Sequence, residues 1–405
     1  MRVLCVSTVP PSHIHETLRF SRLLAEAGHD VLIATEEHLL GAFLDDGLAA
    51  TACLPSLFED ALAAGEETHR AARLLRTGRV TFESAARVLA GPHMGGQLQA
   101  LAAVAQKFEP DLILRDGMDV SACLVAEKAG VPHVALPSGA KGYTHPAALL
   151  PHLDRWRSAI GLPARGDPLS LTAYGHLDHL PPAWSFTPHL PPAYAYRQPA
   201  PARPHARLPG WVADLPTDRP LVYAGIGRAL PRFQPPHEGP AVLPGQPDAV
   251  AVLRAVVAGL SRLECVAVVS TSGVTVHDLE PAPHVRVVES LAQPLLLEAA
   301  DLFLTPGGYS SVREAVRTAT PMAVLPQMAD QPHNARRVTE LGLGGLVTDP
   351  SAAGIASACR RLLADPAVPR RAKQARLATL ALPTAEKAVH HLERLVEHHA
   401  ATDTG

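Results

Sequence analysis

Residues 301–344 hold the polar groups best suited to chemistry, because two polar turns follow two consecutive apolar runs there. The first turn ends the run 302–304 and leads into a helical pattern; it carries Pro306, Gly307, Gly308, Ser310, Ser311 and Glu314. Glycines let backbone amides approach a ligand, and a helix N-terminus offers unpaired N–H groups and a partial positive charge. The turn therefore indicates a site for an anion, with an ordinary helix cap as the alternative.

The second turn follows the apolar run 322–325 and carries Asp330, Gln331 and Asn334. Polar side chains at the carboxyl ends of neighbouring parallel strands line the crevice where open α/β sheets bind ligands. We therefore expect this turn to contribute to the same ligand site.

A histidine and an aspartate in the first half form a second candidate group. His13 follows the apolar strand 3–6 and precedes a helical pattern, a place where histidine can act as a general base. Asp116 follows the strand 112–114 of the same predicted sheet and could orient the imidazole and stabilise its protonated form. The alternatives are an exposed loop histidine and an aspartate that caps a helix or pairs with Arg115.

Short apolar strands alternate with helical patterns in both halves of the chain, which favours parallel, doubly wound sheets. The strands of the first half are expected at 3–6, 31–34, 112–114 and 131–136, with helices over 16–27, 60–107 and 121–129. Those of the second half are expected at 221–227, 265–271, 285–289, 301–305 and 321–326, with a helix over 248–263. A proline-rich stretch from 180 to 220 has no periodic segment and suits a linker.

The predicted class is therefore α/β with two Rossmann-like domains. We expect one such domain over 1–195, a linker over 196–220 and a second such domain over 221–382. A C-terminal helix over 383–405 is expected to cross back to the first domain.

Composition limits the function further. The chain has 405 residues, 47% hydrophobic and 19% charged, with a net charge of -3, so it lacks the electrostatic footprint of a nucleic-acid-binding protein. Its five cysteines are widely spaced, which predicts neither a disulfide framework nor a zinc site and favours a reducing cytoplasm. No apolar window reaches the length of a membrane span or a signal peptide.

The chain resembles the UDP-glycosyltransferase superfamily with the two-Rossmann GT-B fold, and especially its bacterial antibiotic and macrolide branch. The motifs that carry the resemblance lie at 12–13, 28–29, 110–116, 286–297, 306–314 and 326–344 and span nearly the whole chain. The resemblance implies two domains that face each other across a cleft. It also implies an inverting, metal-independent hexosyltransferase, in which a nucleoside diphosphate sugar donates to a natural-product acceptor.

By the same resemblance, His13 is the general base and Asp116 its orienting acid. Gly307, Gly308 and Ser311 would lie at the diphosphate, Glu314 at the ribose hydroxyls, Asp330 and Gln331 at the sugar hydroxyls, and Gln293 near the nucleobase. The full donor set expected is Gly227, Arg228, Ser290, Leu291, Gln293, Pro306, Gly307, Gly308, Ser310, Ser311, Glu314, Asp330 and Gln331. The expected acceptor contacts are Pro11, Ser12, Gly139, Tyr143, His145, Tyr174 and His176.

Three positions depart from the family pattern. Pro306 replaces a histidine that contacts the diphosphate, and Ser290 replaces an aromatic residue that stacks on the base. Arg228 replaces a Ser or Thr, and we hypothesise that its planar guanidinium contacts phosphate; a solvated loop arginine is the alternative. The nucleobase stays open between dTDP and UDP.

Two other functions were weighed. A catalytically inactive GT-B homologue, acting as an accessory partner, is favoured by Pro306 and Ser290. It is opposed by the retained His13, Asp116, Glu314, Asp330 and Gln331. A nicotinamide oxidoreductase is disfavoured, since Gly225-x-Gly227 lacks the third glycine of the dinucleotide fingerprint. The expected partners are the small-molecule acceptor and the nucleotide sugar, without cofactor, metal or nucleic acid. A homodimer is compatible with the sequence, which does not fix the oligomeric state.

Overall fold

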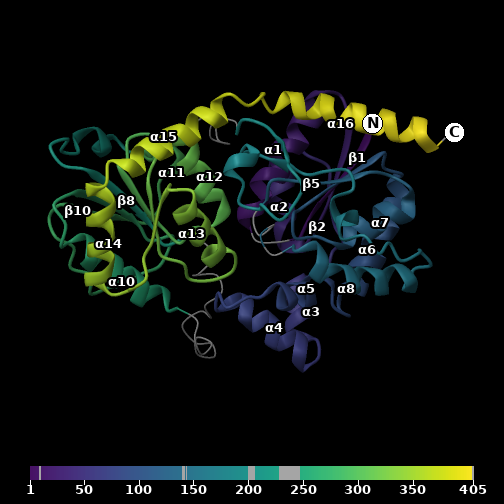
Figure 1. Cartoon of the computed structure of the whole chain (residues 1–405), viewed down its shortest axis with the longest axis horizontal. Coiled ribbons are helices and arrows are strands. Elements are labelled where there is room, and N and C mark those ends of the chain that lie inside the picture. Colours follow the sequence, from purple (N-terminus) through teal and green to yellow (C-terminus); the bar gives the residue numbers. More distant parts are fainter. Residues whose placement is uncertain (9–10, 139–141, 143, 199–205, 228–246, 404–405) are drawn as a thin grey trace. The chain divides into compact units, whose positions relative to one another are not determined.

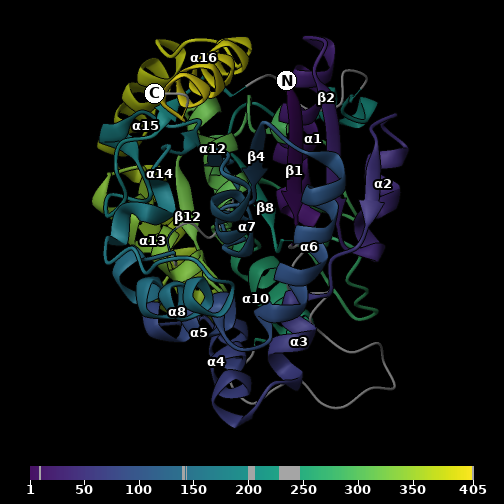
Figure 2. The same ribbon diagram turned by 90° about the vertical axis from the view of Figure 1, so that its right-hand side faces the viewer.

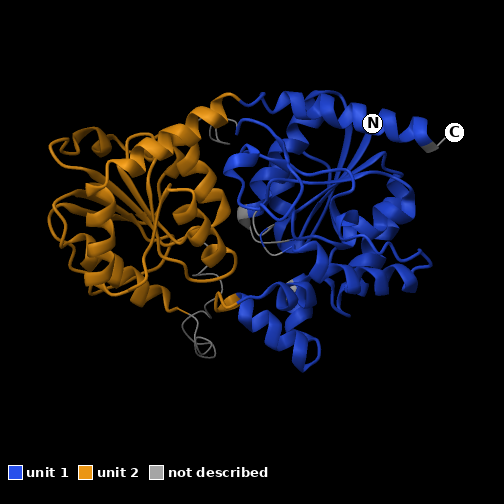
Figure 3. Ribbon diagram, viewed as in Figure 1, with its two compact units in different colours: residues 1–75, 80–199, 382–405 blue, residues 76–79, 200–381 orange. Residues whose placement is uncertain are grey.

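The computed structural model describes residues 1–8, 11–138, 142, 144–198, 206–227 and 247–403. The chain divides into two compact units (Figure 3). Unit 1 comprises residues 1–75, 80–199 and 382–405, and unit 2 comprises residues 76–79 and 200–381. Each unit is built around its own parallel sheet, which confirms the predicted class of two doubly wound sheets.

The sheet of unit 1 has five parallel strands in the order β3-β2-β1-β4-β5 (Figure 1). They are β1 (Arg2–Ser7), β2 (Asp30–Thr35), β3 (Ala50–Ala52), β4 (Leu112–Arg115) and β5 (His133–Ala135). Side chains alternate between the two faces along a strand. In β1, Leu4 and Val6 belong to one apolar layer and Val3 and Cys5 to the other. Both faces are therefore buried, which explains why the strands appear as continuous apolar runs.

Helices cover both faces of this sheet. The layer of Leu4 is completed by α3 (Leu57–Ala63), α4 (Glu66–Arg76), α5 (Phe82–Ala90), α6 (Met94–Phe108), α7 (Ser121–Ala129) and α8 (Pro146–Ala159). Helices α5 and α8 lie side by side (Figure 2). The layer of Val3 is completed by α1 (Pro11–Glu26), α2 (Leu40–Leu44) and the C-terminal α16 (Glu386–Asp403). The last helix of the chain thus packs in unit 1.

The sheet of unit 2 has six parallel strands in the order β10-β9-β8-β11-β12-β13. They are β8 (Leu221–Gly225), β9 (Val266–Ser270), β10 (Val285–Val288), β11 (Leu302–Thr305), β12 (Met322–Val324) and β13 (Gly344–Leu346). Its helices are α10 (Ala249–Leu260), α11 (Gln293–Leu296), α12 (Tyr309–Thr318), α13 (Gln331–Glu340), α14 (Ala352–Ala364) and α15 (Ala367–Leu380). Val222 and Ala224 pack under α10 and α14, while the ring of Tyr223 between them stacks on Phe303, 5.2 Å away.

Two segments differ from the sequence-based expectation. Helix α1 begins at Pro11 instead of near residue 16, so His13 lies in its first turn and not in a loop before it. The proline-rich stretch 180–198 packs within unit 1, where Phe186 is buried and β7 (Tyr194–Ala195) pairs with β6 (Leu177–Asp178). Prolines interrupt helices there but do not prevent burial.

None of the helices in the described ranges is both long and apolar enough to cross a bilayer. All five cysteines are described, and their thiols are free.

Candidate functional site

The parallel pairing of β1 with β4 brings His13 and Asp116 together. The two strands are parallel neighbours, and the Asp116 amide donates to the Val6 carbonyl at 3.0 Å, so Asp116 lies directly beyond the carboxyl end of the sheet. His13 Nδ1 lies 2.9 Å from Asp116 Oδ2. The His13 side chain is 8% exposed and that of Asp116 is fully buried, so solvent screens this pair little.

The carboxylate of Asp116 stays ionised despite its burial. Burial alone would raise its pKa. The opposing effects are the charge of a protonated His13 and hydrogen bonds from His13, the Met118 amide and the Ser138 hydroxyl, and together they lower the pKa below its ordinary value. The Met118 amide donates to Oδ1 at 2.8 Å, which leaves Oδ2 directed at the imidazole.

This geometry suits a general base. When Nδ1–H donates to a carboxylate, the lone pair of the neutral ring is on Nε2, and that nitrogen can take a proton. The carboxylate then stabilises the resulting imidazolium. The roles of His13 as base and Asp116 as its orienting acid stay predictions.

The sequence reasoning missed three buried side chains near this pair, Ser138, Glu16 and His179. Ser138 Oγ accepts a hydrogen bond of 2.6 Å from the Gly117 amide next to Asp116. One turn along α1 from His13, Glu16 Oε2 lies 2.9 Å from His179 Nε2, and both side chains are buried. Ser138 could have been found by the rule that identified Asp116, since it also follows a strand of the sheet; His179 lies outside any recognisable pattern.

In unit 2, the turn between β11 and α12 has the backbone expected of an anion site. Gly307 has φ +86°, a conformation that favours glycine, and a Cβ there would lie 2.5 Å from Val324 Cγ1. Gly308 is the N-cap of α12 and supplies no side-chain cap, and no acidic residue lies in the first turn. The helix end therefore keeps its positive partial charge for a ligand.

Three predicted donor residues are hydrogen-bonded to one another. Gln293 Nε2 donates to Glu314 Oε2 at 2.7 Å and lies 3.3 Å from Ser311 Oγ, while its Oε1 accepts from the Tyr223 hydroxyl at 3.4 Å. Gln293 starts α11, and Ser311 and Glu314 lie on one face of α12. The structure thus places the residues expected at base, phosphate and ribose next to one another.

The second polar turn forms a separate network around Asn334. Its Nδ2 donates to the Gly307 carbonyl at 2.8 Å and to Asp330 Oδ2 at 3.0 Å, which links this turn to the glycine turn. Gln331 Oε1 accepts from the amides of Gln327 and Met328 at 2.8 and 3.0 Å. The Gln331 oxygen thus shapes the loop, and only its amide nitrogen can donate to a sugar.

The remaining predicted donor residues in the described ranges belong to neither network. Gly227 has φ +77°, and a Cβ there would lie 3.2 Å from Pro306 Cγ, so Gly227 and the buried Pro306 meet between the loops that follow β8 and β11. Ser290 is exposed, Leu291 is half-buried ahead of α11, and Ser310 lies in the first turn of α12. Arg228 lies outside the described residues, and its phosphate contact stays a prediction.

The acceptor candidates do not form one group. The His145 ring lies 4.5 Å from that of Phe82 and 5.5 Å from that of His189, so these three form an aromatic cluster after β5. Tyr174 instead packs edge-on to His133, the first residue of β5, and to His399 of α16, which places it towards the amino end of that strand.

His176 is buried and extends the sheet beside Ala135. Pro11 and Ser12 open α1, but their side chains, like Gly139 and Tyr143, lie outside what the structure describes. Within the described ranges, no group of three or more His, Cys, Asp or Glu side chains is arranged to hold a metal ion.

Known proteins are similar to this chain in sequence and in fold. Two family models match it: "Erythromycin biosynthesis protein CIII-like, N-terminal domain" over residues 22–160 and "Erythromycin biosynthesis protein CIII-like, C-terminal domain" over residues 254–395. The L-demethylnoviosyl transferase of Streptomyces niveus is 29% identical over 391 residues, which cover 93% of each chain.

Solved structures establish the fold. The glycosyltransferase VinC in complex with dTDP superposes with a TM-score of 0.73 at 23% identity, covering 98% of this chain and 100% of that one. The spinosyn rhamnosyltransferase SpnG complexed with thymidine diphosphate gives a TM-score of 0.74 at 22% identity, covering 97% and 100%. Since the N- and C-terminal family models match in chain order and together span more than half of the sequence, the chain belongs to the erythromycin biosynthesis protein CIII-like family of bacterial natural-product GT-B glycosyltransferases.

Proposed function

We propose that this protein is an inverting glycosyltransferase that moves a sugar from a nucleoside diphosphate sugar to a hydroxyl group of a natural product. The observation that carries the proposal is the buried contact of 2.9 Å between His13 Nδ1 and Asp116 Oδ2. A histidine held in this way is a base with its orienting carboxylate, the arrangement needed to activate an alcohol.

In the proposed reaction, His13 Nε2 takes the proton from the acceptor hydroxyl. The acceptor oxygen attacks the anomeric carbon from the side opposite the leaving group, a new C–O bond forms, and the bond between that carbon and the diphosphate oxygen breaks. Asp116 stabilises the imidazolium that results. A single displacement of this kind inverts the configuration at the anomeric carbon.

For the donor, we propose that Gly307, Gly308 and the first turn of α12 bind the diphosphate. The uncapped helix end offsets the charge that develops on the leaving group, so the proposed chemistry needs no divalent metal. Glu314, next to Gln293 at 2.7 Å, would accept hydrogen bonds from the ribose diol. Asp330 and the Gln331 amide nitrogen would contact the sugar hydroxyls.

Both dTDP and UDP remain candidates for the nucleotide. The structures of VinC and SpnG named above hold dTDP, which favours a dTDP sugar for this chain. For the acceptor, the predicted contact His145 lies in an aromatic cluster with Phe82 and His189, and Phe82 is 37% exposed.

One observation favours the alternative of an inactive GT-B homologue. Pro306 has no backbone N–H, and its ring is buried against Gly227 at the point where the family has a phosphate-contacting histidine. The alternative predicts no turnover with any donor.

Thermal unfolding with dTDP, UDP, GDP and their sugars tests donor binding, because a ligand that binds only the folded state raises the Tm. We expect dTDP to raise the Tm. We also expect release of dTDP from a dTDP sugar when a hydroxylated natural product is added. A Tm that no nucleotide moves would contradict the proposal and leave the inactive homologue.

A further inference from the structure

A buried arginine beneath the Asp116 loop has no role in the reaction just described. Arg115 is the last residue of β4 and directly precedes Asp116. Its side chain is 2% exposed, which places a full positive charge in the interior of unit 1. Such burial is costly unless the charge makes many hydrogen bonds.

The guanidinium of Arg115 is bound by backbone carbonyls. Nη1 donates to the carbonyls of Asp116, Gly117 and Asp119 at 3.3, 3.4 and 3.0 Å. Nη2 donates to the Leu171 carbonyl at 2.9 Å. Within the described residues, no carboxylate forms an ion pair with Arg115, and its Nε has no hydrogen-bond partner. The side chain therefore binds main chain and not acidic groups.

The three Nη1 contacts all fall on the loop that carries the proposed orienting acid. Residues 116–119 connect β4 to α7, and the Asp119 amide also donates to the Asp116 carbonyl at 3.1 Å. Carbonyls that converge on one cation fix the course of the loop. That course decides where the Asp116 carboxylate points, since Oδ1 accepts from the amide of Met118 inside the same loop.

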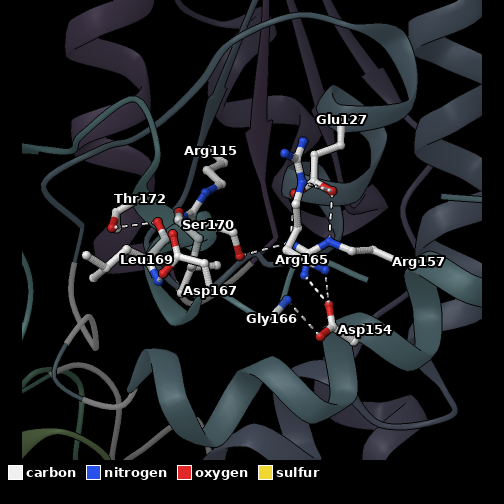
Figure 4. A network of polar contacts seen from close by, with 11 residues as sticks. Arg115, Glu127, Asp154, Arg157, Arg165, Gly166, Asp167, Leu169, Ser170 and Thr172 are labelled. Carbon is white, nitrogen blue, oxygen red and sulfur yellow. Dashed lines mark hydrogen bonds and ion pairs between the residues drawn. The ribbon is translucent and has the colours of Figure 1, made fainter. Parts of the chain in front are cut away.

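The fourth contact connects the loop to a rigid support. Leu171 lies in the 3-10 helix η3 (Pro168–Thr172). In the same helix, the Ser170 hydroxyl accepts from Arg157 Nη2 at 3.1 Å. Arg157 is fully buried and pairs with Glu127 and Asp154, each at 2.7 Å (Figure 4). The Asp116 loop is thus tied through Arg115 and η3 to α7 and α8.

We propose that Arg115 is a positioning residue for the proposed general base: its guanidinium holds the 116–119 loop so that Asp116 Oδ2 meets His13 Nδ1. This inference rests on the proposed function. The inference does not require the charge of Arg115 to act on the imidazole. Arg115 acts by hydrogen bonds that fix the position of the loop. A planar fork can reach carbonyls on two sides at once, whereas a lysine ammonium acts as a point charge with fewer directions.

The test compares Arg115→Met, Arg115→Lys and the control Arg157→Met. The control also removes a fully buried arginine, but one without contact to residues 116–119. Two readouts are used at a temperature well below each Tm. One is kcat and the donor KM of transfer; the other, which needs no turnover, is the low-field proton NMR signal of His13 Nδ1–H, assigned by its loss in His13→Ala.

We expect Arg115→Met to lower kcat about 10- to 100-fold while the donor KM stays within about 2-fold, as for a displaced catalytic group. Arg115→Lys should lose at least about 5-fold, and both variants should shift or broaden the low-field signal. Arg157→Met should lower the Tm and should lower kcat less than Arg115→Met does, because Arg157 reaches the loop only through η3 and the single Leu171 contact. Should Arg115→Met not fold, Arg115→Lys carries the comparison.

Three results would overturn the inference: parental kcat and an unchanged low-field signal in the Arg115 variants, full rescue by lysine, or an equal loss of kcat in Arg157→Met. If the parent protein transfers no sugar, the proposed function fails, and the low-field signal still decides whether Arg115 positions the His13 contact.

Discussion

His13 Nδ1 and Asp116 Oδ2 lie 2.9 Å apart although 103 positions separate the two residues in the chain. The parallel pairing of β1 with β4 creates this proximity, because it places the ends of both strands at the same edge of the sheet. A contact between residues this distant in sequence is a property of the fold, and it gives the two side chains a joint function that neither has alone.

Replacing Asp116 with Asn should slow transfer by about 10³-fold or more, by analogy with other histidines that lose their orienting carboxylate. An amide cannot offset the imidazolium charge, and it can donate to Nδ1 and so favour the wrong tautomer. Single-turnover transfer measures the rate, and dTDP affinity serves as the control because Asp116 lies in unit 1. A rate within about 10-fold of the parent would contradict the role of Asp116.

Glu314→Ala should weaken dTDP binding about 10- to 100-fold, the range expected when a hydrogen bond to a charged group is lost. The matched control is Glu298→Ala. Glu298 is 40% exposed and pairs with Arg317 of α12 at 2.8 Å, so it contacts the same helix but does not bind Gln293. Isothermal calorimetry would measure both affinities. Equal affinities of the two variants would remove Glu314 from the donor site.

Gly307→Ala should destabilise the protein by about 1–3 kcal/mol, because alanine at φ +86° is strained and its Cβ would lie 2.5 Å from Val324 Cγ1. Gly308→Ala should cost less than about 1 kcal/mol, since a Cβ at Gly308 meets no atom within 4 Å. Urea unfolding of both variants measures the difference. Indistinguishable unfolding free energies would show that the turn is not as rigid as described.

His133 should make the protein acid-sensitive. Burial, and then the positive charges of Arg115, Arg157 and Arg165, lower its pKa from 6.5 to about 3. Below about pH 6.5, His133 is protonated in the unfolded chain but stays neutral in the folded chain. The free energy of unfolding therefore falls as the pH drops from there towards 3.

We expect His133 alone to lower the free energy of unfolding by about 1.4 kcal/mol for each pH unit between pH 6 and 4. The His133→Leu variant should lose that part of the slope and no more, as measured by urea unfolding at several pH values. The parent and the variant having the same slope would show that His133 is protonated in the folded protein.

The sequence predicted the two sheets well because their strands are apolar runs buried on both faces. It did not predict β13, because two of its three residues are Gly344 and Gly345, which have no side chains to form a hydrophobic pattern. This strand forms because its backbone pairs with β12, and a Cβ at Gly344 would collide with the Met322 carbonyl. Backbone pairing leaves no signal in the hydrophobic pattern.

The sequence named residues of the candidate site but did not predict the contacts between them. Motif spacing selected Gln293 and Glu314 individually, whereas their direct hydrogen bond depends on how α11 packs beside α12. Tyr174 is one of the expected acceptor contacts, yet its ring packs against His133 and His399. Ring packing of this kind depends on α16, more than 200 residues further along the chain.

The most direct test of the account is sugar transfer by His13→Ala compared with the parent, using a dTDP sugar and an acceptor found by screening, together with dTDP affinity. We expect His13→Ala to transfer no sugar above background and to bind dTDP with an affinity within about 2-fold of the parent. We expect the product of the parent enzyme to have the inverted anomeric configuration. Transfer by His13→Ala at a rate close to that of the parent would contradict the proposal that His13 is the general base.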